Sequence, residues 1–288
     1  MKNSTDKIIV FGASGMLGNS ILRCFHDSGI DVFGTLRDEE KKKLLPDSIQ
    51  DRLISNISAD DLDSFESIVK EIKPSHVINC IGVIKQNNTA QDPIKTIFIN
   101  SILPHQLYRI CKNNKVKLIH MSTDCVFSGK KGNYSEDDIS DCYDLYGKSK
   151  FLGEINCDDA LTIRTSIIGH ELNSKLSLID WFLNQKDQVK GYKKAIFSGM
   201  PTIEIARILR DFVIPNLYLT GIVHLAAKPI NKYELLKLVA KTYKKNIKLI
   251  EDNTIIIDRS LNGSNFERDT GYKPKPWGEL IEDMKSFG

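Results

Sequence analysis

The 288-residue sequence lacks the features that mark several large classes of protein. It has no apolar run of 18 residues, and no apolar leader follows its first residues, so we expect a cytoplasmic protein with no membrane partner. Its 40 basic and 37 acidic residues nearly cancel, giving a formal charge of +3. That balance argues against nucleic acid as a partner. Its six cysteines show no CxxC spacing, which argues against a metal site or a disulfide framework.

Short apolar segments alternate with helical patterns along the chain. Strands are predicted at 7–12, 30–36, 76–82, 117–123, 160–166 and 222–227, and helices at 16–28, 60–73, 94–114, 144–156, 177–188, 203–213 and from Asn231. Strands that are apolar almost throughout, with helices between them, indicate a parallel sheet covered on both faces, a doubly wound (Rossmann) α/β fold. We expect a dinucleotide-binding Rossmann domain at 1–170 and a smaller C-terminal substrate-binding lobe at 171–288. A segment at about 203–228 should return to the Rossmann core.

Three glycines, Gly12, Gly15 and Gly18, lie between the first predicted strand and the first predicted helix. In such a position the first glycine allows a tight turn, the second lets the backbone approach a pyrophosphate, and the third lets the helix pack closely. The start of the helix also supplies free N–H groups. The segment therefore predicts dinucleotide binding rather than a purely structural turn.

The tip of the second predicted strand carries Arg37 followed by Asp38. An acidic side chain at this position usually binds the free ribose 2′-OH of NAD(H). A guanidinium can instead bind a 2′-phosphate with two hydrogen bonds. Because Arg37 is the first charged residue, we favour NADP(H), while binding of a ribose hydroxyl by Asp38 stays open.

Tyr146 and Lys150 are four residues apart, so on a helix both side chains lie on one face. A neighbouring ammonium favours the ionised phenol and brings its pKa closer to neutral pH. Thr123 ends a predicted strand, and its hydroxyl can stabilise the oxygen of a carbonyl that accepts a hydride, while Tyr146 gives that oxygen its proton. Lys150 would also orient the cofactor. Taken alone, the Tyr-Lys pair could be an ordinary surface pair.

These segments resemble the extended short-chain dehydrogenases, and within them the dTDP-4-dehydrorhamnose reductase group. The GxxGxxG spacing is typical of the former, and the stretch STDCVFSGKKGNYSEDDISDCYDLYGKSKFLGE at 122–154 is similar to the latter. Cognate segments fall at Asn100, Pro104, Arg164, 199–202, 224–227 and Asn231. The resemblance implies NADPH-dependent reduction of a nucleotide-linked 4-keto-6-deoxyhexose, with Thr123, Tyr146 and Lys150 catalytic. The cofactor-binding residues that it implies are Gly12, Ser14, Gly15, Met16, Leu17, Gly18, Arg37, Cys80, Gly82, Asn100, Tyr146 and Lys150.

The same resemblance implies a sugar site. It assigns Asp124, Val126, Phe127 and Glu136 to positions near the sugar, and Arg259 to a position near the nucleotide phosphates. Arg259 could equally form a salt bridge with Asp258 or Asp252.

Two departures from the family pattern fall beside the sugar. Cys125 replaces an aromatic residue, and IGVIKQNN occupies 81–88 where an Ala-rich stretch is usual. They favour a UDP-linked 2-acetamido-2,6-dideoxy-hexos-4-ulose over dTDP-4-dehydrorhamnose. Lys85 and Gln86 are then candidate substrate contacts, or else solvated loop residues.

Other candidates have plainer interpretations. Trp181 lies on an apolar helix face, where packing is the default and stacking on a nucleotide base the alternative. His120 and His224 lie within apolar strands and are expected to be interior histidines with satisfied hydrogen bonds.

Two other functions compete with reduction. A nucleotide-sugar epimerase or dehydratase shares the fold, but a dehydratase commonly has Asp-Glu after the threonine, where this chain has Asp124 and Cys125. A regulatory subunit that binds NADP(H) without turnover would have no physical reason to keep Thr123, Tyr146 and Lys150 together. A homodimer through paired helices would be usual for this fold class.

Overall fold

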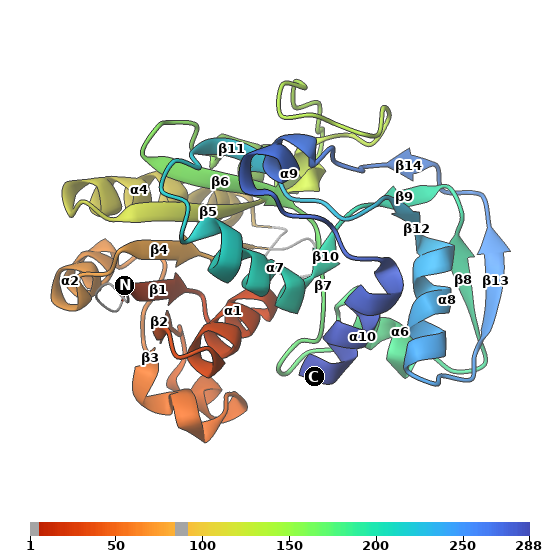
Figure 1. Cartoon of the computed structure of the whole chain (residues 1–288), viewed down its shortest axis with the longest axis horizontal. Helices are drawn as coiled ribbons and strands as arrows, with labels where there is room; N and C mark the ends of the chain where they lie inside the picture. The colour runs from red at the N-terminus through yellow and green to blue at the C-terminus, as the bar shows by residue number, and fades with distance from the viewer. Residues whose placement is uncertain (1–5, 84–91) are drawn as a thin grey trace.

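A computed structural model describes residues 6–83 and 92–288, and within them the largest sheet has seven strands, all parallel. Its order is β11-β6-β5-β4-β1-β2-β3 (Figure 1). The strands are β1 (Lys7–Phe11), β2 (Asp31–Thr35), β3 (Leu53–Ile54), β4 (His76–Asn79), β5 (Lys117–Thr123), β6 (Ala160–Thr165) and β11 (Gly221–His224). Helices cover both faces, which confirms the predicted doubly wound α/β fold.

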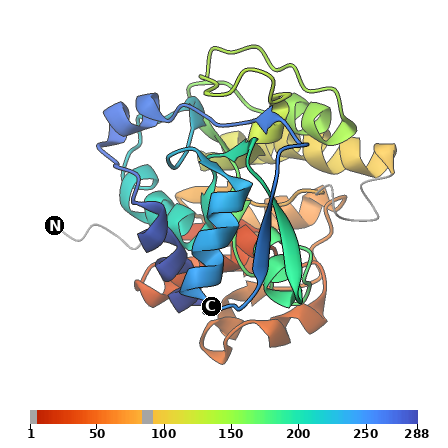
Figure 2. The same cartoon turned by 90° about the vertical axis from the view of Figure 1, so that its right-hand side faces the viewer.

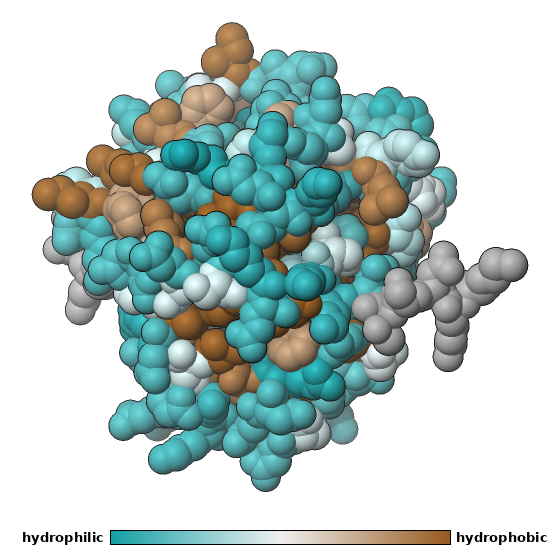
Figure 3. Space-filling view, turned by 90° about the vertical axis from the view of Figure 1, so that its left-hand side faces the viewer, coloured by the Kyte–Doolittle hydropathy of each residue, from teal (hydrophilic) through white to brown (hydrophobic). Residues whose placement is uncertain are grey.

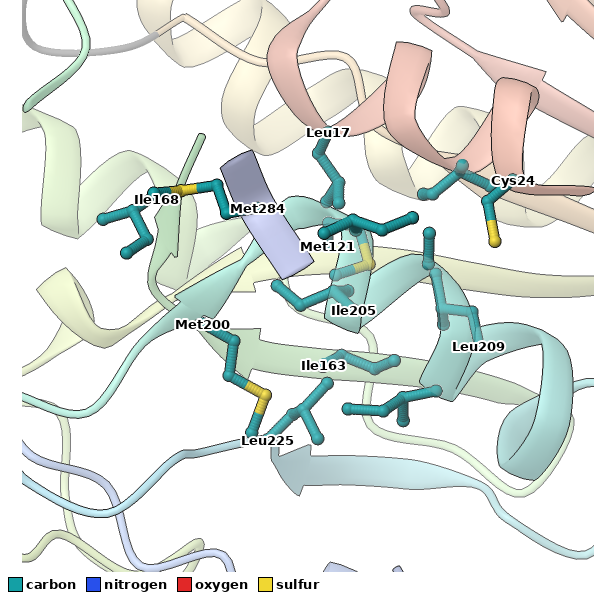
Figure 4. Packing of buried hydrophobic residues seen from close by; sticks show 14 of the residues in the cluster. Leu17, Cys24, Met121, Ile163, Ile168, Met200, Ile205, Leu209, Leu225 and Met284 are labelled. Atoms are coloured by element: carbon teal, nitrogen blue, oxygen red, sulfur yellow. The ribbon is translucent and has the colours of Figure 1, made fainter. Parts of the chain in front are cut away.

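The alternation of side chains along β1 separates two hydrophobic cores. Ile8 and Val10 pack into one core, and Ile9 and Phe11 into the other. The first core lies under α1 (Met16–Asp27), α7 (Thr202–Ile208) and α10 (Trp277–Phe287). The second lies under α2 (Leu62–Ile72) and α4 (Leu103–Asn113). Figure 4 shows the first core, where Leu17 of α1 and Ile205 of α7 approach one another above the sheet. Each face of the sheet is therefore sealed by its own helices.

The C-terminal lobe is built from short strands and three helices (Figure 2). Its strands are β7 (Ile167–Ile168), β8 (Gln188–Tyr192), β9 (Ala195–Phe197), β10 (Met200–Pro201), β12 (Ile230–Asn231), β13 (Lys248–Asp252) and β14 (Ile257–Asp258). Its helices are α6 (Leu178–Asn184), α8 (Lys232–Thr242) and α9 (Ser264–Thr270). Between them, β11 pairs with β6 in the main sheet and α7 packs on α1. The division at residue 170 stays a prediction.

The helix predicted at 94–114 is confirmed over Pro93–Asn113, but a π-helical turn lies within it. It consists of α3 (Pro93–Ile97), a π-helical turn η4 (Phe98–Ile102) and α4. Pro104 has no N–H, so it cannot donate the helical hydrogen bond to the carbonyl of Asn100, four residues earlier. The backbone of Gly153 packs against that carbonyl so closely that any side chain there would collide with it. Turns of this kind are frequent at functional sites, and this one contains the buried Asn100.

Shorter irregular elements complete the described chain. They are the 3-10 helices η1 (Glu39–Leu44), η2 (Asp47–Arg52) and η5 (Asp124–Val126) and the π-helical turn η6 (Leu209–Val213). The remaining α-helix, α5 (Leu145–Leu152), is regular and contacts β5. No described helix is long and apolar enough to span a bilayer. Apolar side chains are nevertheless exposed on α3, η4 and α5, namely Ile94, Ile97, Ile102, Phe151 and Leu152. Figure 3 shows that apolar side chains, in brown, are exposed on this face of the molecule among hydrophilic ones. A homodimer stays a prediction.

Candidate active site

The turn after β1 is shaped by glycines. Gly12 has φ of +84°, a conformation that favours glycine, and an added Cβ would lie 3.2 Å from the backbone of Cys80 and Ile81. A side chain on Gly18 would collide with the Gly12 carbonyl, so α1 packs directly on the turn. No described side chain caps the start of α1, and its first turn holds no acidic residue. The first N–H groups of α1 can therefore bind an anion such as a pyrophosphate.

The remaining residues of this turn differ in accessibility. Gly15 is exposed, and Ser14 and Met16 are half-buried. Leu17 is only 7% exposed and packs in the core (Figure 4). Its side chain therefore packs beneath the turn and has little surface left for contact with a cofactor.

Arg37 lies at the tip of β2 with its side chain 65% exposed. Its Nε lies 3.3 Å from a carboxylate oxygen of Asp38, which also lies 3.3 Å from Lys41 Nζ. Burial opposes ionisation of Asp38, but Lys41 and Arg37 outweigh it and lower the pKa of Asp38. Two cations thus surround one carboxylate at this position.

The segment after β4 is held by Asn100, whose side chain is fully buried. Its amide oxygen accepts from Val83 N (2.9 Å), and its amide nitrogen donates to Val83 O (3.1 Å) and Ser149 Oγ (3.1 Å). Gly82 is exposed beside it, and Cys80 is half-buried. With its hydrogen-bonding capacity used in this way, Asn100 positions the segment and α5 relative to each other.

The phenol of Tyr146 and the hydroxyl of Thr123 are hydrogen-bonded to each other. Thr123 ends β5, and its Oγ1 also donates to Asp124 (3.2 Å) and accepts from Cys125 N (3.1 Å). Burial raises the pKa of Tyr146, followed by the effect of Cys125 and opposed by the Thr123 hydrogen bond. The phenol is therefore protonated at neutral pH and can act as a proton donor.

Lys150 lies one turn further along α5 and is 5% exposed. Its Nζ donates to the Met121 carbonyl at 2.7 Å. Burial lowers the pKa of Lys150 to about 8, opposed by Glu154 and Cys80. The expected lowering of the Tyr146 pKa is not seen: its pKa is raised, because burial dominates and the Lys150 ammonium is directed to the Met121 carbonyl.

A buried ion pair lies next to Thr123 and Lys150 in the structure. Glu154 and Arg164 side chains are each 3% exposed and lie 2.8 Å apart. Glu154 also accepts from Ser122 Oγ at 2.6 Å, and Arg164 lies 3.3 Å from His224 Nε2. The pair therefore links the end of α5 to the ends of β5, β6 and β11.

Sequence reasoning missed Lys232 of α8. This ammonium and the Arg259 guanidinium both act on Asp124. Burial raises the pKa of Asp124, and the two cations oppose that rise only in part. Arg259 Nε donates to the Phe127 carbonyl at 2.9 Å. Neither alternative salt bridge forms among the described residues, because Asp258 accepts from Ser260 and Asp252 from Thr254. The only sequence signal for Lys232 was the helix predicted to begin at Asn231.

Several residues assigned to the sugar site bind the protein itself. Val126 and Phe127 are fully buried, with the Phe127 ring stacked on Tyr134 at 4.2 Å. The two carboxylate oxygens of Glu136 accept from His224 N (2.9 Å) and Asn265 Nδ2 (2.8 Å). These three side chains are therefore engaged with the protein itself, and their placement near the sugar stays a prediction.

The two substrate candidates beyond β4 cannot be placed. Lys85 and Gln86 lie outside the described residues. Among the described residues, no group of His, Cys, Asp and Glu could hold a metal ion.

The two histidines and the tryptophan that were expected to be interior residues differ in how they are placed. His224 is fully buried, with both ring nitrogens engaged by Tyr134 O and Arg164. His120 is also fully buried, but its Nε2 has no partner in the described chain, so only its interior position is confirmed. Trp181 is 40% exposed. The expected core packing of Trp181 is wrong because α6 buries Ile179 and Phe182, and position 181 points to another side.

One protein family matches nearly the whole chain. A family described as the RmlD substrate binding domain matches residues 6–284. A probable low-salt glycan biosynthesis reductase, Agl14 of Haloferax volcanii, is 29% identical over 165 residues, covering 55% of this chain and 52% of that protein. The chain thus matches about half the length of this relative.

Two further matches span more of the chain. Methionine adenosyltransferase 2 subunit beta of Danio rerio is 23% identical over 252 residues, covering 82% of this chain and 74% of that protein. The crystal structure of a dTDP-4-dehydrorhamnose reductase from Bacillus anthracis in complex with NADP superposes with a TM-score of 0.79. It shares 19% identity, with 98% of this chain and 99% of that chain covered, and at that identity the likeness shows the fold.

Proposed function

The chain belongs to the RmlD substrate-binding domain family, and on this premise we propose that it is an NADP(H)-dependent reductase of a nucleotide-linked 4-keto sugar. The observation that carries the proposal is the hydrogen bond between Thr123 and Tyr146 at the carboxyl end of β5. Lys150 lies one helical turn away, and the glycine turn lies at the same edge of the sheet. Ligands of doubly wound sheets bind at this edge.

The residues present fit a dinucleotide. Gly12 and Gly18 form a cradle that side chains would fill, and the start of α1 offers N–H groups to a pyrophosphate. Lys150 would hold the ribose next to the nicotinamide, and Arg37 the 2′-phosphate. When bound, the dinucleotide supplies a hydride.

The chain's own part in the reaction is to manage charge on the carbonyl oxygen. Thr123 can donate a hydrogen bond to that oxygen as negative charge develops on it. Tyr146 is protonated at neutral pH and can transfer its proton to the same oxygen. Lys150 takes part through the cofactor, since its ammonium, which donates to the Met121 carbonyl at 2.7 Å, would also bind the ribose beside the nicotinamide.

We further propose that the substrate is a UDP-linked 2-acetamido-2,6-dideoxy-hexos-4-ulose, or otherwise dTDP-4-dehydrorhamnose, used in making surface polysaccharide sugars. The named reductases among the relatives support a keto sugar. Arg259 would bind the diphosphate, since its side chain is half-buried and acts on Asp124 beside Thr123.

A panel of UDP- and dTDP-linked 4-keto sugars, assayed by NADPH oxidation with the purified protein, tests this proposal. Turnover of one of them at stoichiometry of one NADPH per sugar is the expected result. A protein that oxidises NADPH with none of these sugars would contradict it.

The match to a methionine adenosyltransferase subunit favours a second candidate, a regulatory subunit that binds NADP(H) without turnover. Such a protein would bind NADPH but leave it unconsumed with every sugar. Tight copurification of NAD, with no consumption of added NADPH, would instead indicate an epimerase. The panel of sugars, together with the identity of any copurified cofactor, separates all three functions.

Replacing Arg37 with glutamate is expected to weaken NADPH binding about 10- to 100-fold relative to NADH. The substitution removes an exposed guanidinium from the tip of β2 and places like charge beside a 2′-phosphate. The ratio of dissociation constants for the two cofactors is the measurement. Lys43→Glu, an equal charge change at an exposed position nearby, is the control. An unchanged ratio in the Arg37 variant would show that the phosphate is held elsewhere.

Turnover is expected to fall as pH rises through about 8, because Lys150 loses its proton there. A lysine is charged below its pKa, so the ammonium that would hold the cofactor ribose is present at pH 7 and lost above 8. A pH profile of kcat/KM from 6 to 10 is the measurement, with Lys150→Arg as control, since a guanidinium keeps its charge throughout this range. A profile of the unchanged protein that stays flat to pH 10 would contradict the role.

A further inference from the structure

Lys232 is held in a defined place where the C-terminal lobe meets the main sheet. It is the first residue of α8, and Asn231 caps that helix by accepting from Glu234 N at 2.8 Å. The antiparallel pairing of β12 with β9 sets Ile230 opposite Phe197. Lys232 Nζ lies 3.8 Å from the centre of the Phe197 ring. Backbone pairing, a helix cap and a cation–π contact therefore fix the ammonium together.

The Lys232 ammonium lacks polar partners of its own. It makes no hydrogen bond and no ion pair with any described residue, although its side chain is largely buried and burial lowers its pKa to about 8. A mostly desolvated ammonium that contacts an aromatic ring but has no hydrogen-bond acceptor is costly for the folded protein. Such a group is expected where a ligand supplies the missing acceptor.

The carboxylate whose charge acts on Lys232 is that of Asp124, the residue after Thr123. Asp124 is 7% exposed, and one of its oxygens accepts from the Thr123 hydroxyl. The two charges affect each other but do not reach ion-pair distance among the described residues. An oxygen that carries a hydrogen can lie between them, because a hydroxyl accepts from an ammonium and donates to a carboxylate at the same time.

We propose that Lys232 and Asp124 together bind a hydroxyl group on the sugar carbon next to the carbonyl that is reduced, with Lys232 donating to the hydroxyl oxygen and Asp124 accepting its hydrogen. Thr123 and Asp124 are adjacent, so a carbonyl at Thr123 brings its neighbouring carbon to Asp124. The substrate class is then an α-hydroxy ketone. This inference rests on the proposed reductase function and adds to it a requirement for carbon 3 of a 4-keto sugar.

Two nucleotide-linked 4-keto sugars, alike except that one has a hydroxyl and the other a hydrogen at carbon 3, test the inference. The unchanged protein is expected to favour the hydroxylated sugar about 10- to 100-fold in kcat/KM, the size of a hydrogen bond to a charged group. Lys232→Met keeps a long apolar stem on Phe197 and removes the charge. It is expected to lose about 10- to 100-fold on the hydroxylated sugar and less than about 3-fold on the other.

Lys237→Met is the matched control, because Lys237 lies on the same helix with its side chain 63% exposed. It should retain the activity of the unchanged protein on both sugars. The unfolding temperature of Lys232→Met should be no lower than that of the control, since the substitution removes a costly buried charge, and the NADPH dissociation constant should be equal; together these separate recognition of the sugar from folding. An equal loss on both sugars, or no loss, would overturn the inference while leaving the reductase function intact. If the unchanged protein reduces neither sugar, the proposed function fails, and this inference fails with it.

Discussion

Replacing Tyr146 with phenylalanine is expected to lower turnover about 100-fold or more, because general-acid catalysis by a positioned side chain is typically of that size. The substitution removes only the phenol oxygen, which is hydrogen-bonded to Thr123. The glycine turn and Lys150 remain, so the dissociation constant of NADPH should change little. Steady-state kcat with a 4-keto sugar and NADPH binding by fluorescence are the two measurements.

Tyr143 offers a matched control for this prediction. It lies three residues earlier and is 72% exposed, so Tyr143→Phe should keep the activity of the unchanged protein. Equal turnover in Tyr146→Phe and Tyr143→Phe would remove Tyr146 from the reaction. A loss of NADPH binding in Tyr146→Phe alone would assign the phenol to the cofactor instead.

Replacing Glu154 with glutamine is expected to lower the free energy of unfolding by about 3–5 kcal/mol. The change leaves the Arg164 guanidinium buried without a charged partner, and that residue is 3% exposed. Breaking one half of a buried ion pair is far more costly than losing a pair at the surface. Chemical denaturation of the two proteins at neutral pH measures the difference.

The exposed pair of Lys193 and Glu251 provides the comparison, with side chains 38% and 50% exposed. Glu251→Gln should change stability far less than Glu154→Gln. A second result should accompany the stability change: because Glu154 raises the pKa of Lys150, its removal should move the fall in kcat/KM to lower pH. Similar stability of both variants would contradict the role of the buried pair.

Local patterns predicted the dinucleotide half of the fold well. The strand expected at 117–123 has those bounds in the structure, and the helix expected at 16–28 ends one residue earlier. Both have strong periodicity and clear end signals. The expected strand at 76–82 stops at Asn79, because the Asn79 side chain accepts from Ile81 N at 3.0 Å and turns the chain. A side chain that binds backbone in this way is not visible as an apolar pattern.

The substrate side was harder to predict because its residues meet through the fold alone. Glu136 accepts from His224 N, 88 residues along the chain, and no spacing rule relates the two positions. Lys232 lies 108 residues after Asp124. Both relations depend on how the short strands of the C-terminal lobe return to the main sheet. The family resemblance identified the segments, but it could not give the partners of Phe127 and Glu136 within the protein, which are Tyr134 for the first and His224 and Asn265 for the second.

The return of the chain to the main sheet has a further consequence. Ser20 of α1 and Thr202 of α7 are hydrogen-bonded at 2.8 Å, and β11 forms the edge of the sheet beside β6. A fragment that stopped near residue 170 would leave the apolar face of α1 uncovered and β6 as an unpaired edge strand. Both features promote aggregation. Unfolding of α7 and β11 would therefore also destabilise α1 and the glycine turn before it. We expect the two lobes to unfold as one cooperative unit.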